Sequence, residues 1–156
     1  MKTFDSPDAL EAEVGKEIAV SEWLQITQDR VNLFAEATDD PQWIHLDEER
    51  ARKESPFGGT IAHGYLTLAL LPRFFATVVD LPFAKMNINY GANKLRFPAP
   101  MKVGRRMRAR FGLLAVERLP GCVQSVWQYT AEQQGSDKPV CVAEVVLRQY
   151  YGVSSR

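Results

Sequence analysis

The feature that most constrains the fold is the segment IAHGYLTLALLPRFFATVVD, residues 61–80, which is apolar around almost its whole circumference. It is too long for a strand and has the length of a helix. Pro72 and Arg73 near its centre exclude a membrane span, which needs roughly 18 or more uninterrupted apolar residues. A helix that is apolar on every side has to be covered by other elements. We therefore expect this segment to form the centre of the core.

The residues after this segment have the pattern of strands that can supply the cover. They are divided by GlyAla, ProAlaPro, ProGly and GlySerAsp, which we interpret as turns. From Cys141 onward, apolar residues alternate with polar Glu144 and Arg148, as in a sheet with one buried face. The prediction is an α+β fold in which an antiparallel sheet wraps around one long central helix, in a single domain over residues 1–156. The expected strands are 86–91, 93–100, 105–119, 122–133 and 139–152.

The first half of the chain is predicted to be helical. Thr27 is placed to cap a helix with an apolar stripe that includes Val31, and Pro41 is expected to end that helix by moving Asp40 out of the helical region. Asp47 is placed to cap a short charged helix that lies outside the core.

The charge of the chain is zero overall but is unevenly distributed. Residues 1–54 carry 14 acidic and 6 basic residues, whereas residues 55–156 carry 5 acidic and 13 basic ones. Seven of these basic residues fall between Lys94 and Arg110. Such a run either binds an anion or forms the solvated face of a strand, and both interpretations stay open.

Other composition features exclude several classes of function. Cys122 and Cys141 are far apart and lack a CxxC or histidine partner, so we expect buried free thiols and neither a disulfide nor a metal site. The N-terminal residues have no apolar run of the kind found in signal peptides. We expect a cytoplasmic protein without membrane or nucleic-acid partners.

The stretch TDDPQWIH, residues 38–45, holds one of the two histidines and two adjacent carboxylates. Asp40 and His45 are five positions apart and cannot share a helical face, but the break at Pro41 allows both side chains to enter one pocket. A carboxylate and an imidazole around one water are suited to proton transfer. The alternatives are that Asp40 caps the next turn and that His45 is structural.

Three blocks carry a resemblance to a known family. TDDPQWIH, followed by PFGGTIAHGYLTLALLP and by INYGANKLRFPAP, resembles the MaoC-like, or hydratase 2, group of hot-dog-fold proteins, and most closely its nodulation protein N-like branch. The resemblance covers roughly residues 20–150. The family pattern usually has a glycine immediately before the catalytic aspartate, and this chain has Asp39 there.

The resemblance implies an (R)-specific enoyl-CoA hydratase, which adds water reversibly to a trans-2-enoyl thioester and gives an (R)-3-hydroxyacyl thioester. Asp40 and His45 would transfer the protons, and the N–H of Gly64 would stabilise the thioester oxyanion. His63, next to Gly64, is expected to pack or cap the helix. No metal or organic cofactor is required, because the acyl-CoA is the substrate.

Further expectations concern binding and assembly. We expect Lys94, Arg96, Arg106 and Arg108 to meet the phosphates of CoA, with Arg110 on the same strand face. A homodimer is expected because one short sheet leaves an edge uncovered, and the resemblance implies that substrate lies between the subunits. Two other functions stay open, namely a hot-dog acyl-CoA thioesterase and a non-catalytic acyl-binding subunit.

Overall fold

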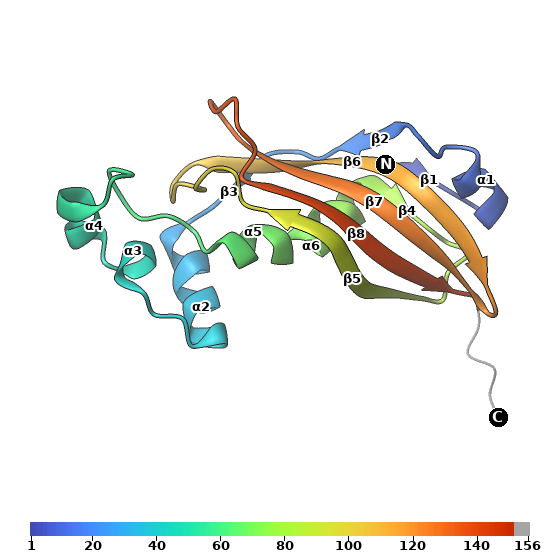
Figure 1. Cartoon of the computed structure of the whole chain (residues 1–156), viewed down its shortest axis with the longest axis horizontal. Helices are drawn as coiled ribbons and strands as arrows, with labels where there is room; N and C mark the ends of the chain where they lie inside the picture. Colours follow the sequence, from blue (N-terminus) through green and yellow to red (C-terminus); the bar gives the residue numbers. More distant parts are fainter. Residues whose placement is uncertain (152–156) are drawn as a thin grey trace.

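One large antiparallel sheet curves over a helical segment in the computed structural model, which describes residues 1–151 (Figure 1). The strand order is β2-β6-β7-β8-β5, with the short β3 also paired to β6. This is the predicted α+β arrangement, although Gly152, the expected end of the last strand, lies outside the described residues. The strands are β2 (Glu17–Val20), β3 (Leu24–Gln25), β5 (Met86–Arg96), β6 (Arg106–Leu119), β7 (Cys122–Gln133) and β8 (Cys141–Tyr150).

The central segment is helical as expected, but it is two helices and not one. Helix α5 (Gly64–Ala69) ends at Leu70, and α6 (Leu71–Val78) begins immediately after it. Pro72 explains the break, because it has no N–H to continue the helical bonding and its ring crowds the preceding turn. Regular bonding resumes where the N–H of Phe74 donates to the carbonyl of Leu70 at 3.1 Å.

The sheet covers most of this segment but leaves one stripe of it open. Leu66, Leu71 and Phe74 are buried against the sheet. A fully buried phenylalanine such as Phe74 contributes roughly 2–3 kcal/mol through apolar burial. On the other side Tyr65, Ala69, Pro72 and Ala76 are exposed, so the expectation of an all-round cover is wrong for the single chain.

Aromatic side chains attach α6 to the sheet. The ring of Phe75 meets Trp127 edge-on at a centroid distance of 4.9 Å and Phe111 at 5.3 Å. These T-shaped contacts add to the energy of burial. The hydroxyl of buried Tyr129 donates to the carbonyl of Thr67 at 2.7 Å, which fixes α5 to the same sheet. Cys122 and Cys141 are buried free thiols, as predicted.

The GlyAla pair at residues 91–92 is not a turn. It lies inside β5, where the pairing with β8 shifts register between Asn89 and Gly91 and again between Ala92 and Lys94. A bulge inserts an unpaired residue that bends a strand without ending it, which is a common position for glycine. The two strands expected here are therefore one bent strand at the edge of the sheet.

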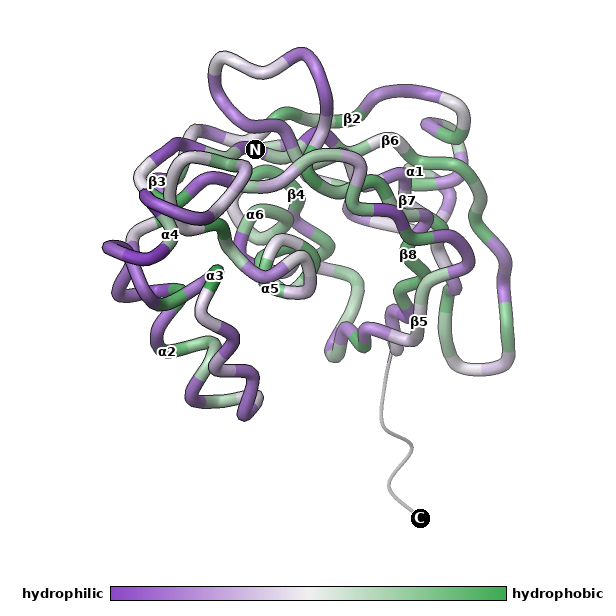
Figure 2. Tube along the Cα trace, turned by 60° about the vertical axis from the view of Figure 1, so that its left-hand side comes forward, coloured by the Kyte–Doolittle hydropathy of each residue, from purple (hydrophilic) through white to green (hydrophobic). Residues whose placement is uncertain are grey.

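Three helices form a lobe beyond one end of the sheet (Figure 1). The N-caps of α2 and α4 are the predicted ones, because Thr27 accepts from the N–H of Arg30 at 3.2 Å and Asp47 accepts from that of Arg50 at 2.9 Å. Figure 2 shows hydrophobic colour along much of β8 and mostly hydrophilic colour on the lobe. The lobe consists of α2 (Gln28–Thr38), α3 (Trp43–Leu46) and α4 (Glu48–Glu54).

At the opposite end, the N-terminal residues pack beside the sheet. Helix α1 (Pro7–Glu11) is held by Arg118 of β6, which pairs with Asp8 and Glu11. Strand β1 (Lys2–Thr3) forms a short parallel pair with β4 (Val79–Asp80). Within residues 1–151, none of the helices combines the length and the apolar character that crossing a membrane requires.

Candidate active site

The backbone at the end of α2 aims the Asp40 segment away from the helix. Asp39 adopts the left-handed conformation with φ 53° and ψ 38°, and the N–H of Asp40 donates to the carbonyl of Ala35 at 3.1 Å. This bond from a residue to the fifth one before it is typical of a helix that ends in a left-handed residue. Glycine adopts that conformation without strain, which gives a physical reason for the glycine of the family pattern at this position.

His45 is a buried imidazole whose orientation is fixed by a main-chain group. It lies on α3, is 7% exposed, and its Nδ1 is 2.6 Å from the carbonyl oxygen of Ile61. A carbonyl only accepts, so Nδ1 carries the hydrogen and Nε2 keeps a free lone pair. Burial lowers the pKa of His45, against the raising effects of the Ile61 bond and of the Asp40 charge. The neutral, proton-accepting form is therefore favoured near neutral pH.

His63 lies directly against both predicted residues. Its ring stacks on that of His45 with a centroid distance of 3.8 Å and an angle of 25°. Its Nε2 is 3.0 Å from the main-chain oxygen of Asp40 and 3.8 Å from a carboxylate oxygen of the same residue. His63 precedes α5 without capping it by a side-chain bond, so of the two expected roles only packing is seen. Its contact with Asp40 was not predicted.

The predicted pair is therefore together in space, with a third group beside it. A carboxylate oxygen of Asp40 and one ring nitrogen from each histidine all lie within 4.8 Å of one another. Both histidines are buried, whereas the side chain of Asp40 is 53% exposed. The carboxylate of Asp40 therefore faces solvent, whereas the two imidazoles beside it are enclosed by protein.

The hydrogen bonds in this cluster determine which ring nitrogens carry hydrogen. Nε2 of His63 faces a carbonyl oxygen and so carries its hydrogen, as does Nδ1 of His45. A protonated ring nitrogen has no lone pair for a metal ion. The other nitrogen of each ring, Nε2 of His45 and Nδ1 of His63, keeps its lone pair and is able to accept a proton or to bind a metal ion. That the chemistry needs no metal stays a prediction.

Gly64 begins α5 immediately after His63. Within residues 1–151 its N–H donates to no protein group. A Cβ at this position would lie 2.8 Å from Cδ2 of Phe97, so the ring of Phe97 occupies the space that a side chain would need. Phe97 was not predicted as a site residue, and the sequence shows no signal for this long-range contact. A side chain at position 64 would therefore have to displace the ring of Phe97, independently of any role of the Gly64 N–H.

The model of the MaoC like domain matches residues 9–131 of the chain. The chain belongs to this family. Among curated proteins, 3-hydroxyacyl-thioester dehydratase Z of Mycobacterium tuberculosis is 52% identical over 95% of this chain and 98% of its own length. Nodulation protein N of Rhizobium meliloti is 42% identical over 88% and 87% of the two chains. The predicted family is confirmed.

A solved structure of the same kind supports the fold. The unliganded R-hydratase PhaJ1 of Pseudomonas aeruginosa has 30% sequence identity and a TM-score of 0.68, over 90% of this chain and 83% of that one. The predicted hot-dog fold is therefore confirmed. The names of these relatives agree with the activity that the sequence predicted.

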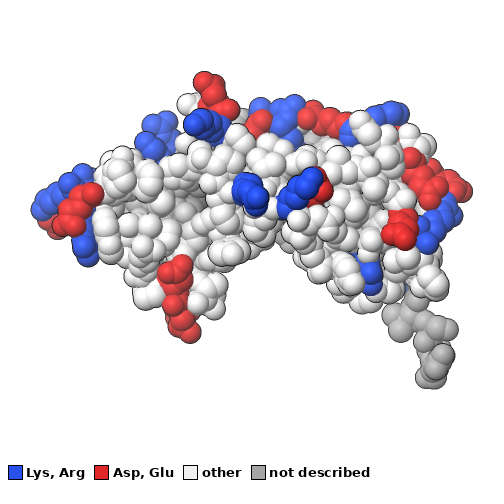
Figure 3. Space-filling model, viewed as in Figure 1, with Lys and Arg blue, Asp and Glu red and all other residues white. Residues whose placement is uncertain are grey.

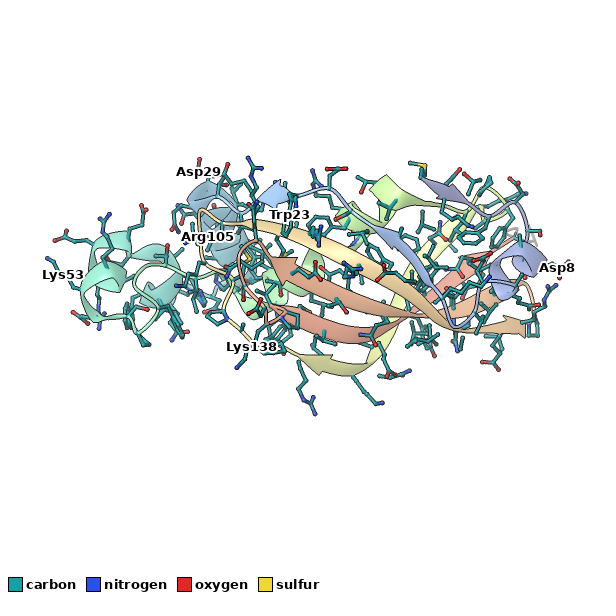
Figure 4. All side chains as sticks on the ribbon, turned by 90° about the horizontal axis from the view of Figure 1, so that it is seen from above. Asp8, Trp23, Asp29, Lys53, Arg105 and Lys138 are labelled. Atoms are coloured by element: carbon teal, nitrogen blue, oxygen red, sulfur yellow. The ribbon has the colours of Figure 1, made fainter. Side chains whose placement is uncertain are left out.

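In this MaoC-like chain, the basic residues predicted to meet the CoA phosphates do not surround the cluster of Asp40, His45 and His63. In β6 the buried positions face the core, so Arg106, Arg108 and Arg110 share the outer face of the sheet as predicted. Figure 4 looks onto that face and shows Trp23 and Arg105 toward its end next to α2. Arg108 stacks on Trp23 at 4.5 Å and pairs with Glu132 at 2.7 Å.

Some of the other basic side chains also form ion pairs with acidic ones. Arg110 binds Glu17 at 2.8 Å, and Lys94 binds Glu144 at 3.2 Å. Arg96 donates to the carbonyl of Leu95, the residue before it. Phosphate binding by this group would have to compete with the carboxylates at Arg108, Arg110 and Lys94, whereas Arg106 is exposed and has no carboxylate partner among residues 1–151.

The left-handed conformation of Asp39 leads to a prediction about stability. We expect Asp39→Gly to raise the free energy of unfolding by about 0.5–1 kcal/mol, because glycine removes the strain of a side chain at positive φ. Urea denaturation measures the change. The control is Glu36→Gly, one turn earlier on the exposed side of α2, which should lower stability by about 1 kcal/mol. If both variants lose the same free energy of unfolding, the left-handed conformation assigned to Asp39 is contradicted.

Proposed function

We propose that this protein is an (R)-specific enoyl-CoA hydratase, equally a 3-hydroxyacyl-thioester dehydratase, of the hydro-lyase class. The observation that carries the proposal is the convergence of the Asp40 carboxylate and the buried His45 imidazole within 4.8 Å, with Nδ1 of His45 held by Ile61. The relatives named as 3-hydroxyacyl-thioester dehydratase and R-hydratase support the same activity.

The geometry suggests how the two groups divide the work. The free Nε2 of His45 accepts a proton from a water molecule, whose oxygen then bonds to C3 of the enoyl thioester. The Asp40 carboxylate accepts a hydrogen bond from the second O–H of that water and orients it, and this hydrogen stays on the oxygen. The proton taken from the water returns from the pair to C2, so that one molecule of water is added across the double bond. In dehydration the same steps run in reverse.

Charge develops on the thioester oxygen during this reaction. The N–H of Gly64, next to His63 in the chain, is the group we assign to that oxygen. The packing of Phe97 against the α-carbon of Gly64 supports this role, because it holds the main chain at one place. Neither step needs an organic cofactor, since CoA enters as part of the substrate.

An apolar groove beside the central segment suits an acyl chain. It has a volume of about 470 Å³ and lies between the helices and the bent edge strand β5. The small residues Gly91 and Ala92 of the bulge line it, so the bend leaves room there. Helix residues Leu68, Leu71 and Pro72 form the opposite wall. The groove begins about one turn along α5 from Gly64, which is where a chain attached to the reacting carbons would continue.

The central test is hydration of crotonyl-CoA by variants of the two residues. Asp40→Asn and His45→Gln should each lower kcat on the order of 10²-fold or more, since each removes a positioned acid or base. The double variant should be scarcely worse than the poorer single one, because groups that act together are not additive. Loss of enoyl absorbance measures the reaction, and circular dichroism confirms that the variants are folded.

Asp39→Asn is the matched control for this series, because it makes the same chemical change one residue away and should be mild. If it abolishes hydration while Asp40→Asn does not, the assignment is wrong by one residue. Release of free CoA thiol in place of hydration would identify a thioesterase. Absence of either reaction would favour a non-catalytic acyl-binding subunit.

The CoA phosphates are assigned, as a further part of the proposal, to Lys94, Arg96, Arg106 and Arg108. We expect Arg106→Ala and Arg108→Ala together to raise KM for crotonyl-CoA about 5-fold or more at low salt, because each charged contact contributes up to about 1 kcal/mol. Lys85→Ala with Lys138→Ala removes the same charge from exposed positions elsewhere. An unchanged KM in the arginine variant, or an equal rise in the control, would show that phosphate lies elsewhere.

The assembly we propose is a homodimer joined at the β5 edge. Along β5, Met86, Ile88 and Tyr90 are large apolar side chains that are exposed in the single chain. The exposed stripe of Tyr65, Ala69, Pro72 and Ala76 faces away from the sheet. Figure 3 shows a hollow between the lobe and the body of the sheet, with few charged side chains on it. An uncovered edge and an uncovered apolar stripe are both suited to a second copy of the chain.

Light scattering tests this assembly. The mass at micromolar concentration should be twice the 17.6 kDa of the chain. Ile88→Asp, which places like charges near each other at the joined edges, should shift the protein toward monomer. Val14→Asp is the control, because Val14 has nearly the same exposure, 42% against 40% for Ile88, but lies outside the edge strand. A clean monomer for the unchanged protein would contradict the proposal.

A further inference from the structure

One polar side chain links the elements that carry His45. Gln28, the first residue of α2, donates from Nε2 to the main-chain oxygen of His45 at 2.7 Å. Its Oε1 accepts from the hydroxyl of Thr60 at 2.7 Å. The first distance is at the short end of the range for an N–H···O bond, and the second is typical of an O–H···O bond. A third, exposed bond runs from the same Nε2 to Asn32 at 2.9 Å.

These bonds act on His45 both through its main chain and through the segment that holds its ring. Thr60 immediately precedes Ile61, whose carbonyl holds Nδ1 of His45, and the N–H of Ile61 donates to the carbonyl of Ile44 at 3.1 Å. Gln28 therefore fixes the main chain of His45 and, through Thr60, the segment that fixes the His45 ring. The main chain of His45 and the segment that holds its ring are both bonded to one amide, so they cannot move independently of each other.

The link begins at a point that is bonded to the body of the fold, whereas the helix that it holds is very short. Two residues before Gln28, Ile26 exchanges two main-chain bonds with Gly104 and Arg105 at 2.7 and 2.9 Å, which ties the start of α2 to the residues just before β6. Helix α3 has only four residues and no side-chain cap. A helix of one turn is not stable by itself and depends on external contacts. The bond from Gln28 is such a contact, and it is made to His45, the proposed proton acceptor.

We propose that Gln28 is a positioning residue for His45, a role that rests on the proposed hydratase function. Its primary amide is needed because one planar group must donate to the carbonyl of His45 and accept from Thr60. A carboxylate would turn the first contact into a repulsion between two oxygens. Leucine, of similar size, would remove both bonds and leave the buried hydroxyl of Thr60 without its acceptor.

The kinetic test compares Gln28→Leu and Gln28→Glu with Asn32→Ala in the hydration of crotonyl-CoA. Both changes at Gln28 should lower kcat about 10-fold or more with KM within about 2-fold, because a displaced base slows chemistry and leaves binding intact. Asn32→Ala removes only the exposed branch of the same amide and should stay within about 2-fold of the unchanged protein. Equal effects at Gln28 and Asn32, or a wild-type kcat in Gln28→Leu, would overturn the proposal.

A second readout does not depend on activity. The ring N–H of His45, held by Ile61, should exchange slowly with solvent in the unchanged protein, and Gln28→Leu should speed that exchange about 10-fold or more, as seen by NMR. If the unchanged protein shows no hydration, the proposed function fails while the exchange rates still test the positioning role. Unchanged exchange in Gln28→Leu would contradict that role even where activity falls.

Changes at Thr60 provide the conservative pair. Thr60→Ser keeps the hydroxyl and should retain kcat and slow exchange, whereas Thr60→Val removes the bond to Oε1 of Gln28 and should change both in the same direction as Gln28→Leu. The double variant Gln28→Leu with Thr60→Val should be no worse than the poorer single change, because both break one link. This pair decides the question if Gln28→Leu does not fold. Equal behaviour of the serine and valine variants would count against the link.

Discussion

The whole arrangement depends on the burial of one apolar segment, residues 61–80, against a single curved sheet. Phe74 is fully buried, and Phe75 meets Phe111 and Trp127 edge-on, so α6 cannot shift along the sheet without losing these contacts. The hydroxyl of Tyr129 adds a polar constraint at Thr67. Because α5 is held this firmly, His63 and Gly64 at its start have defined places, and the candidate site is built from that end of the segment.

The site itself is formed by main-chain oxygens as much as by side chains. Two carbonyls, those of Ile61 and Asp40, determine which nitrogen of each histidine carries hydrogen. Burial then disfavours the charged imidazole and lowers the pKa of His45, while the Asp40 carboxylate stays half exposed. A buried neutral base beside a solvent-facing carboxylate is an asymmetric pair, and in the proposed hydration the base takes the proton while the carboxylate orients the water.

A single-layer sheet leaves part of its surface uncovered, and in this chain the uncovered part is the edge strand β5 and the stripe beside it. The outer edge β5 is bent by its bulges at Gly91 and Ala92, and it has no partner strand on its far side among residues 1–151. The stripe of Tyr65, Ala69, Pro72 and Ala76 is apolar and open beside it. The features that leave the groove proposed for the acyl chain open are therefore also those on which the proposed homodimer rests.

The sequence by itself determined the elements whose causes are local. The apolar periodicity of the strands, the caps at Thr27 and Asp47 and the helix end before Pro41 depend on neighbouring residues, and all appear as predicted. The three motif blocks were sufficient for the family, because their order along the chain is itself specific. Where two local signals conflicted, the interpretation failed. Pro72 divided the expected long helix, and Gly91 marked a bulge where a turn was expected.

The tertiary structure alone decided which residues meet across long stretches of chain. His63 against His45, Phe97 against Gly64, and Gln28 between His45 and Thr60 are contacts over 17 or more positions, and they follow from how α2, α3 and the sheet pack. Hydrogen-bond direction, tautomer and burial follow from those contacts. No periodicity or spacing encodes them, because they depend on the distances between elements that the chain brings together only when it folds.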